Sequence, residues 1–358
     1  MNYRYLSARL LILSLVIGLM FSVGSGAAAE MTLEKAPFGE TPDGKAVDIY
    51  TLRNEHGIEA KIATFEGVVV SLLVPDEEGQ VADVVLGYDT LEEYIAHDAF
   101  FGGIADQGTQ RFRHVVWDVV AERKEENSVG LELNAWSQPI DQGPQESIAV
   151  TVHYTLNNDN ELKIEYIATT PEQETTVSLT NQIYFNLAGA GSGDILDHQL
   201  LINGESFYPL EDDTLKPITQ LRGIWGTPMD YTRSTAIGSG LNQENEQIRL
   251  NRGYNHIWKL KKEGEDSLQL AGRVYEPDSK RVLELWTTEP GIWFETGNFL
   301  DGTIVGKGNT VYERHHGFTL TARDLSYSGD PARFPVKTLT PGEPATSTIL
   351  YKFFTLQE

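Results

Sequence analysis

The sequence predicts an all-β protein whose strands are short and mainly antiparallel. Residues 175–189 alternate apolar and polar side chains at the period of a strand. Residues 147–156 repeat this alternation, residues 157–160 have the composition of a turn, and residues 162–166 lead back as the second strand of a hairpin. No linker and no internal repeat divides the chain, so we expect a single domain.

The composition supports a globular protein and excludes some partners. The 358 residues suffice for one large domain or two ordinary ones, and the 40% of apolar residues can build a substantial core. The net charge of −24 repels nucleic acid and anionic lipid, and no basic patch interrupts it. We therefore expect neutral or cationic partners and no nucleic acid. The chain has no cysteine, which excludes disulfides and a cysteine-linked lipid anchor.

Residues 1–29 have the pattern of a secretory signal peptide. Two arginines precede an apolar run over residues 10–23, and three alanines end the segment. The run is short for a membrane span, although an uncleaved anchor is the alternative. We expect cleavage near Ala29, export to a periplasm or beyond, a mature domain of residues 30–358, and no membrane contact after cleavage.

The N-terminal part of the mature chain reads as a series of strands and one short helix. Turns with Asp–Gly, His–Gly and Glu–Gly pairs divide residues 37–94. Asp89 or Thr90 is expected to cap a helical turn, with a glutamate three residues later that completes a capping box.

The sequence predicts neither a metal nor a cofactor. Asp159 and the asparagines around it lack the spaced oxygen ligands and the distal glutamate of a calcium loop, so a turn is the better interpretation. His315 and His316 are adjacent on an expected strand and therefore point to opposite faces. A phosphate-binding glycine loop, a nucleophile elbow and a nucleotide fingerprint are all missing from the sequence.

The segment TTVSLTNQIYFNLAG, residues 175–189, carries the functional pattern. Its apolar face can rest on a core and consists of Val177, Leu179, Ile183, Phe185 and Leu187. Its polar face consists of Ser178, Thr180, Gln182, Tyr184 and Asn186. Amides, hydroxyls and an aromatic ring are what a sugar-binding surface needs. An ordinary half-solvated strand is the alternative.

This segment resembles the central motif of the aldose 1-epimerase (galactose mutarotase) family, which reads close to LTNHSYFNLAG. Residues 289–300, EPGIWFETGNFL, resemble the family's PGIQFYTGNFL, and residues 317–323 stand in the place of GFCLETQ. The resemblance covers nearly all of residues 38–353. It implies a galactose mutarotase-like supersandwich: one large, mainly antiparallel β-sandwich domain with a sugar cleft across a concave sheet face.

The chain departs from the family at the residues that carry the chemistry. The family's catalytic histidine corresponds to Gln182, its catalytic glutamate to Thr321 and its sugar-binding aspartate to Asn255. Arg111 falls on the family's sugar-contacting arginine. The family's Leu-His-Gly-Gly segment, with a second histidine, is missing between residues 104 and 115.

Mutarotation opens a hemiacetal and closes it on the other face of C1, so it needs one group that removes a proton and one that donates a proton. The resemblance implies a glutamate base and a histidine acid, but neither Gln182 nor Thr321 titrates usefully near pH 7. Glu295, which replaces a family aromatic, and His256 are the pair we consider as substitutes.

Three hypotheses follow. The protein is an exported family member that binds a hexose or glycan with weak or no mutarotase activity, an active isomerase with a rebuilt acid–base pair, or a non-catalytic scaffold. The expected carbohydrate-binding residues are Arg111, Asn181, Gln182, Tyr184, Asn255, His256 and Glu295. Convergence on one cleft with an aromatic floor would favour binding, whereas a cleft filled by Trp293 or Phe294 would favour the scaffold. We expect a monomer whose partner is a small neutral sugar or glycan.

Overall fold

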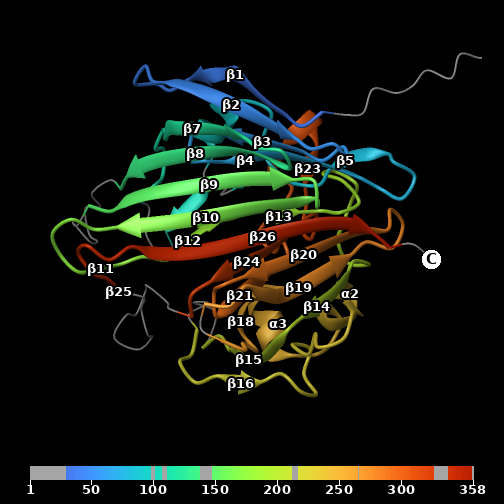
Figure 1. The fold of residues 1–358 in the computed structure, drawn as a ribbon. Coiled ribbons are helices and arrows are strands. Elements are labelled where there is room, and N and C mark those ends of the chain that lie inside the picture. Colours follow the sequence, from blue (N-terminus) through green and yellow to red (C-terminus); the bar gives the residue numbers. More distant parts are fainter. Residues whose placement is uncertain are drawn as a thin grey trace, which may run out of the picture.

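Antiparallel β-sheets dominate the computed structural model, which describes residues 30–97, 101–106, 111–137, 147–211, 217–264, 266–325 and 338–356. The predicted all-β class and antiparallel sandwich are confirmed. Figure 1 shows the long strands side by side across the molecule, with β1 and β2 at one end and β15 and β16 at the other.

The largest sheet has nine strands. In spatial order they are β17 (Thr235–Ala236), β14 (Gln199–Ile202), β19 (Gln269–Tyr275), β20 (Arg281–Thr287), β26 (Ala345–Thr355), β10 (Glu161–Thr169), β9 (Ala149–Asn157), β8 (Ser128–Trp136) and β7 (Asp118–Lys124). β9 and β10 form the predicted hairpin, and their side chains alternate strictly between buried and half-buried positions. One face of this sheet therefore covers a core, as the sequence pattern predicts.

Two further sheets supply the opposite layer. The six-stranded sheet has the order β13 (Tyr184–Phe185), β24 (Phe318–Arg323), β21 (Gly291–Glu295), β18 (Asn255–Leu260), β15 (Gly204–Tyr208) and β16 (Arg222–Gly223). The five-stranded sheet has the order β1 (Thr32–Glu40), β2 (Ala46–Arg53), β3 (Glu59–Ala63), β4 (Val69–Pro75) and β5 (Val81–Asp83). One continuous apolar cluster joins all three sheets, with Leu72 from β4, Val152 from β9 and Phe294 from β21 among its members.

Short elements complete the fold. The two-stranded ladders are β11 (Thr175–Thr176) with β25 (Thr338–Leu339), β12 (Leu179–Asn181) with β6 (Ile104–Asp106), and β22 (Ile304–Val305) with β23 (Val311–Tyr312). The helices are α1 (Leu91–Ala96), α2 (Ile237–Leu241), α3 (Glu246–Asn251) and the 3₁₀ turn η1 (Lys307–Asn309). Thr90 caps α1 and forms the predicted capping box with Glu93.

The segment over residues 175–189 is not the single strand that its alternation suggests. It divides into β11, β12 and β13, which pair with three different partners. The reason lies at Gln182, whose backbone N–H donates to the carbonyl of Gly103 (3.1 Å) and whose carbonyl accepts from the N–H of Gly102 (2.7 Å). All five residues of the apolar face are buried as expected, and Thr180 and Asn186 of the polar face are buried too.

Candidate functional site

The face of the six-stranded sheet opposite the core carries three residues of the predicted site, Tyr184, Glu295 and Asn255. Tyr184 pairs with Thr319, Thr319 with Glu295, and Glu295 with Asn255. Directly paired residues of antiparallel strands share a face, so these four side chains form one row across β13, β24, β21 and β18. Their neighbours Phe185, Phe318 and Phe294 belong to the core on the other side. We call the face with this row the polar face.

A second row runs parallel to the first, two residues along each strand. Thr321 pairs with Trp293, Trp293 with Ile257, and Ile257 with Tyr208. This row places an indole and a phenol beside the amide and the carboxyl of the first row. Planar rings beside hydrogen-bonding groups are suited to the C–H faces and hydroxyls of a sugar.

Glu295 is the carboxyl of the polar face, and its proton affinity is perturbed toward neutrality. Its side chain is buried, and burial raises its pKa to about 7, against the opposing effect of the nearby backbone N–H groups of Asn298 and Gly297 and of the Tyr184 hydroxyl. Oε1 accepts the Asn298 N–H at 2.7 Å, while Oε2 lies outside hydrogen-bond geometry with any residue in the described part of the chain. A carboxyl with a pKa near neutrality can gain or lose a proton in the physiological range.

The two threonines of β24 are hydrogen-bonded to each other. The hydroxyl oxygens of Thr319 and Thr321 are 2.6 Å apart, and both side chains are fully buried. Thr321, which stands in the position of the family's base, therefore offers a paired hydroxyl. It does not titrate near pH 7.

Asn255 lies at the border between this row and an open pocket. Its Oδ1 accepts the indole N–H of Trp293 at 2.7 Å, and its Nδ2 lies 3.4 Å from Oδ1 of Asn251. The pocket has a volume of about 210 Å³, against roughly 30 Å³ for a water molecule in the liquid. Its lining consists of Tyr208, Leu210, Pro217, Asn255, His256, Ile257, Trp293 and Arg323. Trp293 thus lines an open space and does not fill it.

His256 does not stand beside Glu295, so the pairing that the sequence suggested is wrong. It pairs with Phe294 on the core side of the sheet and packs against Phe207 and Trp258. Burial lowers its pKa to about 3, and its Nε2 lies 3.3 Å from Oε1 of Gln247. The imidazole is neutral and shares the face of Phe294, so it does not form an acid–base pair with Glu295.

Arg111 also lies apart from the polar face. Its buried guanidinium is 3.7 Å from the Asp106 carboxylate and donates to the Thr175 hydroxyl (3.3 Å) and the Thr176 carbonyl (3.4 Å). In this structure it joins β11 to the end of β6, which is a structural role.

Asn181 is a core residue and not a sugar contact. Its Nδ2 donates to the carbonyls of Gly102 (2.7 Å) and Gly67 (3.2 Å), and its Oδ1 accepts from the hydroxyls of Tyr154 and Tyr166. These bonds satisfy four groups between the sheets. Gln182, by contrast, is half-buried and lies beside the Tyr184 hydroxyl at the end of the polar row.

The sequence analysis missed Tyr208 and treated Trp293 only as an obstruction. The signal for Trp293 was available, because it precedes Glu295 by two residues on one strand and so shares its face. Tyr208 has no such signal, since nothing in the sequence indicates that β15 pairs with β18.

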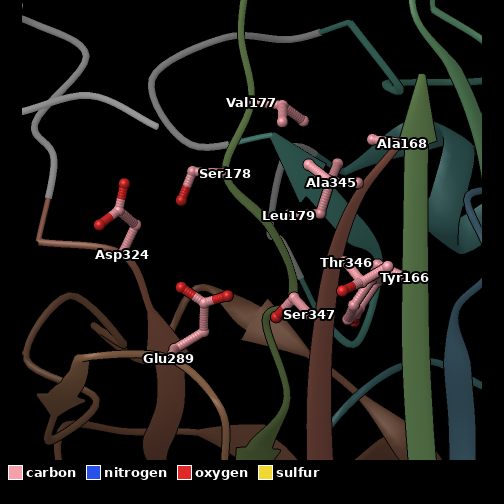
Figure 2. Close-up of a pocket in the computed structure, with 10 residues that line it drawn as sticks. All are labelled: Tyr166, Ala168, Val177, Ser178, Leu179, Glu289, Asp324, Ala345, Thr346 and Ser347. Carbon is pink, nitrogen blue, oxygen red and sulfur yellow. The ribbon is translucent and has the colours of Figure 1, made fainter. Parts of the chain in front are cut away.

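A second cavity, between β10, β26 and residues 177–179, is too small for a sugar. Its volume is about 20 Å³, which holds about one water. Figure 2 shows Glu289, Asp324 and Ser178 on one side and Tyr166 and Ala345 on the other. Over the described ranges, no group of three or more histidine, aspartate or glutamate side chains could hold a metal, and no helix has the length and apolar character to cross a membrane.

Comparison with known proteins decides the family. A profile described as "Aldose 1-epimerase" matches residues 48–112 and 106–352. The chain belongs to the aldose 1-epimerase family. The two matched ranges overlap at residues 106–112 and together span residues 48–352.

The aldose 1-epimerase relatives span almost the whole chain. Galactose mutarotases from Pongo abelii and Homo sapiens are each 33% identical, and the alignments cover 89% and 90% of this chain and 98% of each relative. The crystal structure of galactose 1-epimerase from Lactobacillus acidophilus NCFM superposes with a TM-score of 0.76 at 20% identity, over 92% of this chain and 100% of that one. This structural likeness supports the fold.

Proposed function

We propose that this aldose 1-epimerase family member binds a hexose or a glycan on the polar face, as a monomer, with weak or no mutarotase activity. The observation that carries the proposal is the pocket beside Asn255, whose lining includes Trp293 and Tyr208. The amide and the rings supply hydrogen bonds and C–H contacts, the two needs of sugar binding.

The same face argues against efficient turnover. A positioned acid and a positioned base each contribute typically 10²–10⁴-fold to such a proton transfer. Among the described residues of the two polar rows, Glu295 is the one carboxyl, and the family positions hold the amide of Gln182 and the hydroxyl of Thr321. Half of the acid–base pair is therefore missing.

An active isomerase remains the second candidate, and one observation favours it. The pKa of Glu295 is raised to about 7 by burial, and Oε2 has no hydrogen-bond partner among the described residues. Such a carboxyl could serve as both acceptor and donor in turn. A pure scaffold has less support, because Phe294 is in the core and Trp293 leaves the pocket open.

Replacing Trp293 with alanine is expected to weaken sugar binding at least tenfold, because the indole both forms the pocket wall and holds the Asn255 amide. Isothermal titration of residues 30–358 with D-galactose and D-glucose measures this. Trp136→Ala, an exposed tryptophan at the end of β8, is the matched control and should change nothing.

Polarimetry of freshly dissolved α-D-galactose and α-D-glucose separates the two candidate functions. Wild-type protein should accelerate mutarotation little or not at all. A large acceleration that Glu295→Gln abolishes would replace the first candidate by the second. If the titrations show that neither sugar binds to the wild type or to Trp293→Ala, both candidate functions are contradicted.

We further propose that residues 1–29 are a leader that is cleaved on export. The apolar run between arginines and alanines supports this proposal. Expression of the full chain in a bacterium should yield a periplasmic protein that begins at Glu30. Intact-mass measurement and N-terminal sequencing test it, and an unprocessed N-terminus in the membrane fraction would refute it.

A further inference from the structure

A third row on the polar face carries two cationic residues. Arg323 pairs with Gly291, and Gly291 with Lys259, so a guanidinium and an ammonium come from β24 and β18 on either side of a glycine. Along β24, Thr319, Thr321 and Arg323 occupy successive outward positions, about 6.6 Å apart at 3.3 Å per residue. The cationic row thus lies at the end of the pocket remote from Glu295.

This end of the pocket is lined by one cationic side chain and one neutral histidine. Arg323 lines the pocket together with Tyr208 and Trp293, and it is the one charged residue among the described lining. His256, also in the lining, is kept neutral by burial, which lowers its pKa to about 3.

Two carboxylates also lie near this row. Lys259 donates to Glu205 at 2.7 Å. Asp324, which follows Arg323, acts on the Tyr208 hydroxyl and contributes to its raised pKa, although burial is the main cause. Among the described residues, two cations and two carboxylates thus lie near this row, in a chain whose net charge is −24.

We propose that the ligand of this pocket is an acidic hexose whose anionic group lies at the end remote from C1 and is bound by Arg323. This inference rests on the proposed function and specifies its substrate class. The guanidinium presents a planar fork of donors that matches a carboxylate or phosphate. The family motif has glutamine at this position, which suits a neutral hydroxyl. The rings of Trp293 and Tyr208 then contact the sugar ring, and the anomeric carbon lies toward Asn255.

Isothermal titration of residues 30–358 with D-galacturonate, D-galactose 6-phosphate and D-galactose tests the inference. At 20 mM salt, at least one anionic sugar should bind ten times or more tightly than galactose, and the advantage should shrink at 300 mM salt. Preference for galacturonate identifies a carboxylate ligand, and preference for the phosphate ester identifies a sugar phosphate. Inorganic phosphate alone should not displace either one.

Arg323→Gln should remove this advantage, tenfold or more, so that the acidic sugars bind no more tightly than galactose does to the same variant. Arg323→Lys keeps the positive charge but lacks the planar guanidinium, so it should retain part of the preference for the acidic sugar. It replaces Arg323→Gln in the test if that variant does not fold. Arg233→Gln, an exposed arginine before β17, is the matched control. Equal binding of acidic and neutral sugars, or an equal loss of both in Arg323→Gln, overturns the inference and leaves the proposed function intact. Failure of all three sugars to bind overturns both.

Discussion

Glu295→Gln is expected to raise the free energy of unfolding by about 3 kcal/mol at pH 8 and to change it little at pH 4. The glutamate has an ordinary pKa of 4.5 and a folded-state pKa of about 7 because of burial. Each unit corresponds to about 1.4 kcal/mol. Below pH 4.5 the carboxyl is neutral in both states and folding carries no penalty. As pH rises toward 7 the unfolded chain ionises more readily, so stability falls, and above 7 the full penalty is present.

Urea unfolding at pH 4, 6 and 8 measures this difference. Glutamine keeps an oxygen for the Asn298 N–H, so the hydrogen bond at 2.7 Å survives the substitution. Glu172→Gln, in an exposed turn, provides the control and should leave the pH profile unchanged. Parallel pH profiles for wild type and Glu295→Gln would show that the carboxyl is not buried as described.

Arg281→Met is expected to lower the free energy of unfolding by about 3–5 kcal/mol. The buried guanidinium donates to three carbonyls, those of Val74 (3.1 Å), Leu187 (3.0 Å) and Gln80 (2.8 Å), and lies 3.7 Å from the Asp76 carboxylate. Methionine fills the stem but leaves these acceptors unpaired. The arginine therefore fastens β20 of the large sheet to the five-stranded sheet.

The matched control is Arg273→Met on the adjacent strand β19. Arg273 pairs with Glu284, but its side chain is 43% exposed. The Glu284 side chain is only 8% exposed, but the pair reaches solvent on its arginine side, so this variant should lose clearly less stability than Arg281→Met. Chemical denaturation measures the free energy of unfolding of both variants. Equal losses would contradict the prediction that the buried contacts of Arg281 stabilise the fold more than the Arg273–Glu284 pair does.

Local sequence patterns predicted those elements that depend only on residues close together in the chain. The hairpin of β9 and β10 follows from alternation and an asparagine-rich turn, and the capping box of α1 from Thr90 and Glu93. The division of residues 175–189 was not predictable in this way. It depends on backbone partners at Gly102 and Gly103, more than seventy residues away in the chain, to which no side-chain pattern refers.

In the candidate site, too, the sequence predicted what strand parity determines and did not predict what tertiary contacts determine. Tyr184, Asn255 and Glu295 share a face, as the resemblance implied, because strand parity fixes the direction of each side chain. Parity also excludes His256 from that face, a conclusion that its position directly after Asn255 already permitted. The structural roles of Arg111 and Asn181 depend on tertiary contacts that the sequence does not display.

The order of strands in the nine-stranded sheet has a consequence for how the protein is made. β26, the last strand of the chain, lies between β10 and β20 at the middle of that sheet. Until it emerges from the ribosome, the strands on its two sides have no ladder to join them, and the shared core stays open. A nascent chain of this topology cannot complete the nine-stranded sheet before β26 has been synthesised. Formation of the whole sandwich therefore depends on this one strand.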